Sequence, residues 1–354
     1  MNFKKWITAM TTAALLTVPF SAQAEQVRSY ESYIPVDIDE NWAYDQLDNF
    51  LNADVITGYP VEDGYVELRP DATITRAQFI KILVNALQLT SNQSGKSFTD
   101  VKADDWYAEY VQIGSSLGII SGSNGKFMPD QKITREQLTA FIIRAFENTI
   151  EFNGTPKAFT DVPNGYWAKD TIDKASSLGI VNGYDTLFKP RNHATRAQAM
   201  VMIQRALDLE TNHLPSEQAL HDVVKSFVQE ENRLFEASDF TGLQAHYSLN
   251  TLGYYRALAS YGLEEYEVMI EEGVGFTISI EDTFGVSVLS ATDRYATVEV
   301  TDLIYYFTIS EGDMTYENTM TLDGVYHLQK QANGNWKIYN YAPAFDNAEV
   351  IDVQ

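Results

Sequence analysis

Thr75-Arg76-Ala77-Gln78, Thr134-Arg135-Glu136-Gln137 and Thr195-Arg196-Ala197-Gln198 are three copies of one short motif in this chain. Each copy is followed by apolar residues at positions i, i+3, i+4 and i+7, which is the spacing of one helix face. A threonine followed three residues later by glutamine is typical of a capping box, in which each side chain bonds the other's free backbone amide. The motif therefore predicts three helices that begin at Arg76, Arg135 and Arg196.

The arginine of each motif falls at the first helical position, where a cation is unfavourable by roughly 0.3–1 kcal/mol. The same helix end carries free N–H groups, which make it an anion site. An arginine fork beside it would suit a carboxylate or phosphate supplied from outside. The alternative is that each arginine pairs with a neighbouring Asp or Glu, and both readings stay open on the sequence.

Landmarks recur in one order from about residue 35 to residue 209, which indicates a threefold repeat. Each unit has an aspartate, a tryptophan that opens a first helix, a glycine turn and then the Thr-Arg helix. The aspartates are Asp37, Asp100 and Asp161, the tryptophans are Trp42, Trp106 and Trp167, and the turn glycines are Gly58, Gly122 and Gly183. Because one helix–loop–helix unit is too small to bury its own apolar face, the copies must pack on one another.

The order of these motifs resembles the S-layer homology family over about half of the chain. The similarity rests on Phe98-Thr99-Asp100-Val101, Phe159-Thr160-Asp161-Val162, Leu117-Gly118-Ile119-Ile120-Ser121-Gly122 and the three Thr-Arg motifs. The resemblance implies an all-α pseudo-threefold bundle. It also implies grooves between repeats that bind a secondary cell-wall polymer, commonly one ending in a pyruvylated amino sugar, whose ketal carries a carboxylate.

The resemblance assigns roles to the recurring residues. Arg76, Arg135 and Arg196 are expected to contact the polymer, the three aspartates to shape the grooves, and the three glycines to form turns. Repeat one departs from the pattern, with Asp54 where the other repeats have Gly118 and Gly179, so we expect it to form a weaker groove. Each tryptophan could stack on a sugar, but a tryptophan that opens an amphipathic helix is more often a packing residue, and we favour packing.

The N-terminal residues predict that the protein is exported. Residues 1–24 combine two lysines, an apolar run and Ala22-Gln23-Ala24, and this arrangement predicts a signal peptide with a mature start at Glu25 and no membrane span after its removal. The chain has no cysteine. Its formal charge of −24 argues against nucleic acid as a partner, because nucleic acid is also negatively charged. No cofactor motif, phosphate loop or His/Cys metal spacing is present.

The predicted domains follow from these patterns. An N-terminal segment at 25–34 precedes repeats at 35–90, 98–147 and 159–209. A polar linker at 210–214 then leads to a C-terminal domain at 215–354. In that domain, helical patterns at 216–234, 241–248, 252–261 and 264–271 give way to period-two segments from residue 276 to residue 341, with a hairpin turn at Asn333-Gly334.

Helices followed by antiparallel strands indicate an α+β domain. This order resembles the nuclear transport factor 2-like cone with a curved antiparallel sheet, a superfamily that includes isomerases, dehydratases and non-catalytic modules. Asp239, His246 and His327 are candidate acid–base residues, but their spacing does not demand chemistry.

We therefore expect a non-enzymatic protein on a bacterial cell surface or wall, anchored through its repeats to a secondary cell-wall polymer or peptidoglycan-linked glycan. The alternative is a wall-attached enzyme with an isomerase- or dehydratase-like site in the C-terminal domain. A lattice-forming subunit ranks third.

Overall fold

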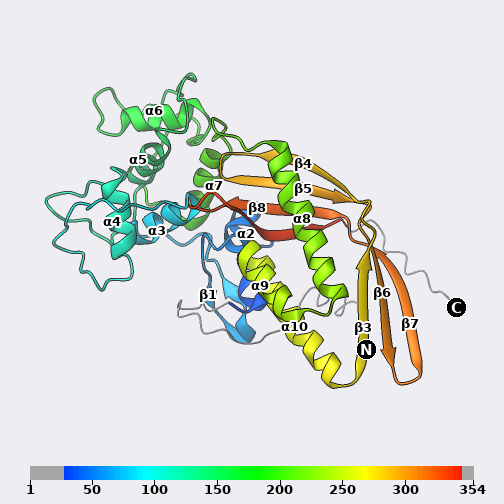
Figure 1. Ribbon diagram of the computed structural model, residues 1–354. Helices are drawn as coiled ribbons and strands as arrows, with labels where there is room; N and C mark the ends of the chain where they lie inside the picture. Colours follow the sequence, from blue (N-terminus) through cyan, green and yellow to red (C-terminus); the bar gives the residue numbers. More distant parts are fainter. Residues whose placement is uncertain (1–27, 345–354) are drawn as a thin grey trace.

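The computed structural model describes residues 28–344, in which a repeat region and a C-terminal domain lie side by side (Figure 1). The signal peptide predicted for residues 1–24 lies outside the described residues. Within residues 28–344, no helix is both long and apolar enough to cross a bilayer.

The three Thr-Arg helices begin where the sequence predicts. They are α3 (Arg76–Ala86), α5 (Arg135–Phe146) and α7 (Arg196–Leu207), and in each the threonine N-cap and the glutamine three residues later make both bonds of the capping box. The first helices of the repeats are α2 (Tyr44–Asn52), α4 (Ala108–Ser116) and α6 (Lys169–Ser177). Gly118 and Gly179 end two of these helices with positive φ, and Asp54 does so in repeat one, as expected from its place in the pattern.

The expectation of an all-α repeat region is wrong. Strands β1 (Tyr59–Pro60) and β2 (Val66–Glu67) pair as a small antiparallel sheet in repeat one. Isolated β-bridges also join repeats, such as Thr75 with Lys132 and Thr134 with His193. The helices are short, so long loops carry backbone groups that must find partners. Helical periodicity shows which residues form helices but does not show how those loops pair.

The C-terminal domain opens with three helices, α8 (Glu217–Glu236), α9 (Phe240–Asn250) and α10 (Gly253–Glu271). Two shorter helices predicted at 252–261 and 264–271 are one continuous helix, because Gly262 is buried within α10 instead of ending it. Seven strands follow: β3 (Val274–Ile280), β4 (Gly285–Ala291), β5 (Tyr295–Thr301), β6 (Ile304–Glu311), β7 (Met314–Thr321), β8 (Gly324–Lys330) and β9 (Trp336–Pro343).

These seven strands form two antiparallel sheets instead of the single curved sheet that the sequence suggested. Their orders are β3-β6-β7 and β4-β5-β8-β9. The chain changes sheet between β5 and β6 at Asp302, which has a φ of 57°, and the Asp323 carboxylate accepts the next backbone N–H, that of Leu303, at 3.0 Å. The protein is therefore a mixed α/β structure with antiparallel sheets.

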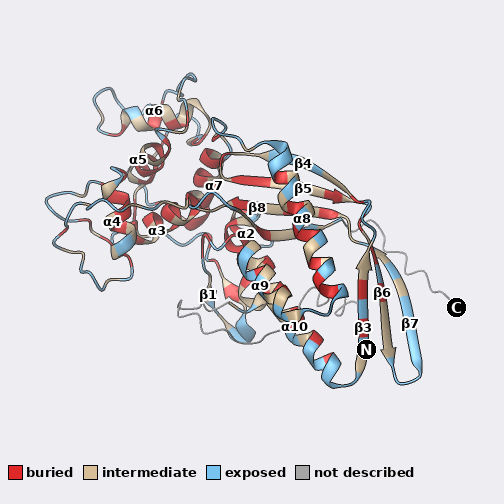
Figure 2. Cartoon of the chain, viewed as in Figure 1, coloured by how far each residue is buried: buried red, intermediate tan, exposed pale blue. Residues whose placement is uncertain are grey.

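The core has two parts (Figure 2). One fills the C-terminal domain between its helices and sheets. The other fills the repeat region and also includes four residues of the C-terminal domain, Leu252, Ala257, Tyr295 and Tyr339. Buried apolar contact therefore continues from one region into the other.

Candidate functional site

The three repeats meet around a pseudo-threefold axis that is marked by a cycle of backbone hydrogen bonds. The N–H of Ile74 donates to Ala194 O at 3.2 Å, that of Ala194 to Ile133 O at 3.0 Å, and that of Ile133 to Ile74 O at 3.0 Å. Each of these residues lies two positions before a motif arginine. The cycle therefore places the three arginines at three equivalent contacts between repeats, which we call the junctions.

Each junction joins the arginine of one repeat to a loop of the next. The Nε atom of Arg76 donates to Phe127 O in repeat two at 2.8 Å, and that of Arg135 donates to Phe188 O in repeat three at 3.0 Å. Arg196 closes the ring by donating to Leu68 O in repeat one at 2.7 Å. We name the junctions 1/2, 2/3 and 3/1 after the repeats they join.

The helix ends at these junctions are not open anion sites. At junction 1/2 the N–H groups of Arg76 and Ala77 donate to Gln131 O and Pro129 O, and that of Gln78 donates to the Thr75 hydroxyl. The other two junctions repeat this arrangement with their own loops. Any anion must therefore be held by side chains and not by free helix N–H groups.

The three guanidinium groups are buried and form no direct ion pair within the part of the chain that the structure describes, although the charges of Asp100, Asp161 and Asp37 favour their charged form. Arg76, Arg135 and Arg196 are 4%, 7% and 5% exposed, and none makes an ion pair with another described residue. Burial lowers the pKa of all three, that of Arg76 to about 10. The alternative that each arginine pairs with a neighbouring acid is thus not what residues 28–344 show.

Aromatic rings cover each guanidinium. The Arg76 Cζ lies 4.9 Å from the Phe127 ring centroid, the Arg135 Cζ 4.8 Å from that of Phe188, and the Arg196 Cζ 5.4 Å from that of Tyr59. Such contacts orient the planar group and offset part of its desolvation. They leave the Nη atoms without a hydrogen-bond partner among the described residues.

The three aspartates hold the loops that face the arginines. The Asp100 carboxylate accepts the consecutive N–H groups of Phe127 and Met128, both at 2.8 Å. Asp37 and Asp161 do the same for Leu68–Arg69 and Phe188–Lys189. Burial opposes ionisation of Asp100, but these backbone bonds outweigh it and lower its pKa. The aspartates therefore fix the carbonyl that each arginine contacts.

The turn glycines allow close approach. Gly122 and Gly183 have φ values of 64° and 65°, and a Cβ atom on either would lie 2.4 Å from a ring atom of Phe98 or Phe159. Gly58 has no such φ, but its Cβ would lie 2.3 Å from Val66 Cβ. All three positions thus exclude a side chain.

The tryptophans do not behave as the favoured packing interpretation expected. Trp42, Trp106 and Trp167 are each more than half exposed. Trp106 stands edge-on to Tyr107, and Lys81 Nζ lies 5.9 Å from its ring. Each tryptophan lies one residue before the N-cap of its helix, and the N-cap residue, which is Ala43, Tyr107 or Ala168, fills the core instead.

Two of the three junctions carry a tyrosine and a second cation that sequence reasoning missed. At junction 3/1 the Arg69 guanidinium lies 4.2 Å from the Tyr59 ring, and at junction 2/3 Lys189 Nζ lies 4.3 Å from the Tyr184 ring. At junction 1/2 the corresponding residues are Ser123 and Met128. The signal was present in the sequence as the residue after each turn glycine and the residue before each loop proline.

The candidate acid–base residues of the C-terminal domain are not brought together. Asp239 caps α9 by accepting Gly242 N–H, and His246 contacts Phe227 O and Asn250, while burial lowers the pKa of both His246 and His327. Among the described residues, no group of three His, Cys, Asp or Glu side chains could hold a metal. The expectation that this domain is not catalytic stays a prediction.

A buried carboxylate that the sequence did not single out lies in the same domain. Glu231 on α8 accepts the Tyr247 hydroxyl at 2.6 Å and the Tyr255 hydroxyl at 3.5 Å, in a setting with Tyr305 and Tyr326. Burial raises its pKa to about 7. Its only sequence signal is a charged residue on the apolar face of α8.

Three helix–loop–helix repeats arranged in a ring, with an arginine at every junction, define a repeat-built module, and comparison with known proteins identifies its family. The S-layer homology domain profile matches residues 97–139 and 158–200, the second and third repeats. The chain is therefore an S-layer homology domain protein, and the S-layer and cell-wall proteins among its relatives place it at the bacterial cell wall or surface.

Two relatives match half or slightly more of the chain, and a third matches most of it. The chain is 33% identical over 181 residues to amylopullulanase of Thermoanaerobacterium thermosulfurigenes, a match covering 50% of this chain and 10% of that protein. It is 26% identical over 206 residues to S-layer protein sap of Bacillus anthracis, covering 58% and 24%. It is 26% identical over 332 residues to an endoglucanase of Bacillus sp. (strain KSM-635), covering 88% and 32%. The chain thus spans a third or less of each relative.

The resemblance of the C-terminal domain to the nuclear transport factor 2-like fold is not confirmed. The intermembrane space region of chloroplast protein ARC6 matches 36% of this chain with 15% identity and a TM-score of 0.29. That score is too low to support a statement about the fold.

Proposed function

We propose that the junctions bind acidic groups of a secondary cell-wall polymer, and that the carboxylate of a pyruvylated amino sugar is the group bound. One observation carries this proposal: three largely buried guanidinium groups have Nη atoms that are not fully enclosed and have no hydrogen-bond partner among the described residues, and the aspartates that favour their charge form no ion pair with them. A buried unpaired charge is costly. A bidentate carboxylate from outside would supply the missing partner.

The exposed tryptophans fit a sugar ligand. Trp42, Trp106 and Trp167 each lie one residue before the N-cap of the first helix of the repeat whose loop faces an arginine. An aromatic face at the rim of such a groove can cover the apolar face of a sugar ring while the arginine holds its acid group. The C-terminal domain is then carried to the wall as a non-catalytic module.

The junctions are expected to bind unequally. Arg76 should contribute least, because junction 1/2 has Ser123 and Met128 where the other two have a tyrosine and a second cation. The sequence predicted a weaker groove at repeat one because repeat one departs from the repeat pattern. In the structure, however, the loop of repeat one that departs from the pattern faces Arg196 and not Arg76, so the reason for a weak contribution from Arg76 is the composition of junction 1/2.

Co-sedimentation with purified wall polymer tests the proposal. Each charge-assisted fork is worth about 1.5–3 kcal/mol, so Arg135→Gln or Arg196→Gln should weaken binding at its junction by tenfold or more. The triple variant, with Arg76→Gln added, should lose retention while circular dichroism shows intact helices. Arg205→Gln, on the last turn of α7, is the matched control.

Two further arms complete the experiment. The wild-type protein should bind polymer without its acidic ketal no better than the triple variant binds the intact polymer. Arg→Lys at all three positions keeps the charge and removes the fork, so it serves where the glutamine variants fail to fold. Undiminished retention of either folded triple variant would show that the arginines are structural.

A further inference from the structure

Two junctions of the ring are tethered by the chain and the third is not. Residues 91–97 connect repeat one to repeat two, and residues 148–158 connect repeat two to repeat three. The first helix of each repeat packs on the Thr-Arg helix of the preceding one, α4 on α3 and α6 on α5. At junction 3/1, α2 packs on α7 in the same way, but no connecting segment holds repeat one to repeat three.

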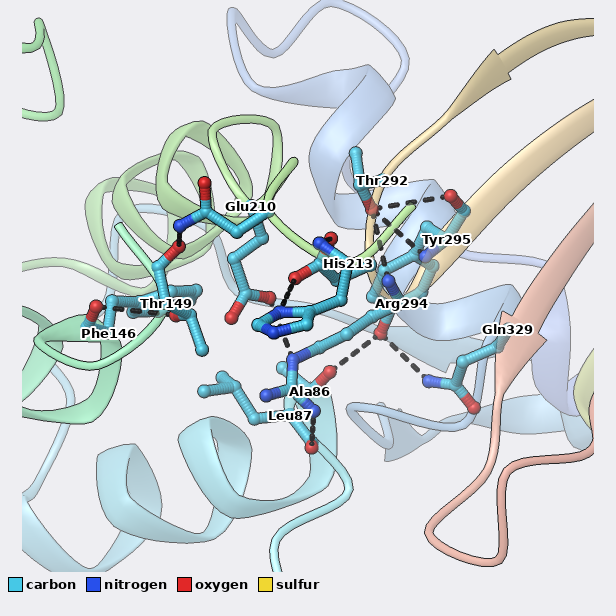
Figure 3. A network of polar contacts seen from close by, with 12 residues as sticks. Ala86, Leu87, Phe146, Thr149, Glu210, His213, Thr292, Arg294, Tyr295 and Gln329 are labelled. Atoms are coloured by element: carbon cyan, nitrogen blue, oxygen red, sulfur yellow. Dashed lines mark hydrogen bonds and ion pairs between the residues drawn. The ribbon is translucent and has the colours of Figure 1, made fainter. Parts of the chain in front are cut away.

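The C-terminal domain follows repeat three directly and reaches across to repeat one. The Arg294 side chain donates from Nε to Glu210 Oε2 at 2.7 Å and from Nη1 to Leu87 O at 2.6 Å. The neighbouring Tyr295 hydroxyl donates to Ala86 O at 3.0 Å (Figure 3). Glu210 follows repeat three and is fully buried, whereas Ala86 and Leu87 end α3 of repeat one. One turn of the C-terminal domain thus joins the end of repeat three to the end of repeat one.

A second contact lies on the helices of junction 3/1 themselves. The Tyr339 hydroxyl on β9 donates to Asn49 Oδ1 on α2 at 2.6 Å. The amide nitrogen of the same Asn49 donates to Gln204 Oε1 on α7 at 3.1 Å. A single side chain therefore links repeat one, repeat three and the C-terminal domain.

The departures of repeat one from the repeat pattern coincide with this docking. Asp54 stands where the other repeats have Gly118 and Gly179, and its carboxylate accepts the Gly253 N–H at 3.1 Å and the Tyr33 hydroxyl at 2.6 Å. Gly253 opens α10 so close to α2 that a Cβ atom there would lie 1.9 Å from Asn52 O. Glycine would suit the φ of 56° at residue 54 better. The carboxylate instead has partners on both sides of the interface, because it also forms an ion pair with Arg28 at 2.9 Å.

We propose that the C-terminal domain is the tether that closes the ring of repeats, and that Asn49, Asp54 and Tyr339 are positioning residues for junction 3/1. The binding part of this inference rests on the function proposed above for Arg196. Repeat one supplies Tyr59 and Arg69 to that junction, and its helix α2 packs on α7, the helix that Arg196 begins. Releasing the tether should therefore loosen one binding groove of three.

Hydrogen exchange of the full-length chain tests the tether without any ligand. The variants are Asp54→Gly, which restores the glycine of the other repeats, and Tyr339→Phe. The control is Tyr341→Phe, which lies on the same strand and loses hydroxyl bonds only to Leu322 O and Asp323 O within the C-terminal domain. The net loss of a hydrogen bond should raise exchange of the α2 amides about fivefold. Unchanged exchange in both variants would overturn the tether.

Binding then tests positioning. In a chain with Arg76→Gln and Arg135→Gln, only junction 3/1 keeps its arginine. Tyr339→Phe in that background should weaken binding of a soluble pyruvylated amino-sugar glycoside about threefold to tenfold, while Tyr341→Phe should not. In a chain with Arg196→Gln instead, Tyr339→Phe should have no effect.

The outcomes separate the two proposals. If Tyr339→Phe speeds exchange of the α2 amides but does not weaken glycoside binding in the chain with Arg76→Gln and Arg135→Gln, the positioning role is overturned. A wild-type chain that binds neither the glycoside nor the polymer would overturn the proposed function, and the exchange experiment would still decide the tether.

Discussion

Replacing the buried Glu231 by glutamine should stabilise the C-terminal domain by an amount that grows as the pH rises from about 4.5 to 7 and is constant above. The Glu231 carboxyl is fully enclosed, accepts the hydroxyls of Tyr247 and Tyr255, and has no cation beside it. Burial raises its pKa from an ordinary 4.5 to about 7. Glutamine keeps the shape and an acceptor oxygen for Tyr247 but carries no charge to desolvate.

The sign follows from proton linkage. Below pH 4.5 Glu231 is protonated in both the folded and the unfolded chain, so its charge costs nothing. Between pH 4.5 and 7 the unfolded chain ionises first, and stability falls as the pH rises. Above pH 7 the full difference between the ordinary pKa of 4.5 and the folded-state pKa of about 7 applies, which is about 3 kcal/mol. Glu231→Gln should remove this loss.

Urea unfolding at pH 4.5 and pH 8, followed by tryptophan fluorescence and circular dichroism, measures the effect. The Glu231→Gln variant should match the wild type at pH 4.5 and exceed it by about 3 kcal/mol at pH 8. Glu230→Gln is the control, because Glu230 is paired with Arg233 at the surface and its pKa is lowered. A variant that is less stable than the wild type at pH 8 would show that Glu231 is stabilised as a carboxylate by its tyrosines.

The remaining predictions concern the interface and the turns. Burial raises the pKa of Asp48 on α2 to about 6, so Asp48→Asn should stabilise the chain by about 2 kcal/mol above pH 6 and not below pH 4. Exposed Asp71→Asn is the control in the same urea assay. Gly183→Ala should lower the melting temperature more than Gly179→Ala, because both have positive φ but only Gly183 would push a Cβ against Phe159. The fragment 215–354 should fold around its own core yet melt below the full chain in calorimetry, since Tyr295 and Tyr339 lose their cover; a melt at an equal temperature would contradict this.

Local signals accounted for much of the secondary structure. The capping boxes at Thr75, Thr134 and Thr195 lie within four residues of the helices they start, so they are readable without knowledge of the fold. The same holds for the alternation along β5 and for the turn at Gly334, which has a φ of 90°. These features depend on backbone geometry and on periodicity over a few residues.

The sequence predicted which residues form the candidate site but not their burial or their ion pairing. Recurrence placed an arginine at each repeat, yet whether that arginine pairs with an acid depends on a loop 51 to 128 residues away. The exposure of Trp42, Trp106 and Trp167 likewise depends on which neighbour fills the core. Burial and ionic pairing are set by what the fold brings near, which a local pattern does not contain.

The sequence by itself determined three repeats with their helix starts, the glycine turns, and a following region of helices and then strands. The tertiary structure alone decided that each arginine faces the next repeat, that the strands divide into two sheets, and that the C-terminal domain docks on repeat one through Asp54 and Asn49. The physical reason is range. Capping and periodicity act within a few residues of chain, whereas docking joins Asp54 to Gly253 and Asn49 to Tyr339, and only the folded chain brings such partners within hydrogen-bond distance.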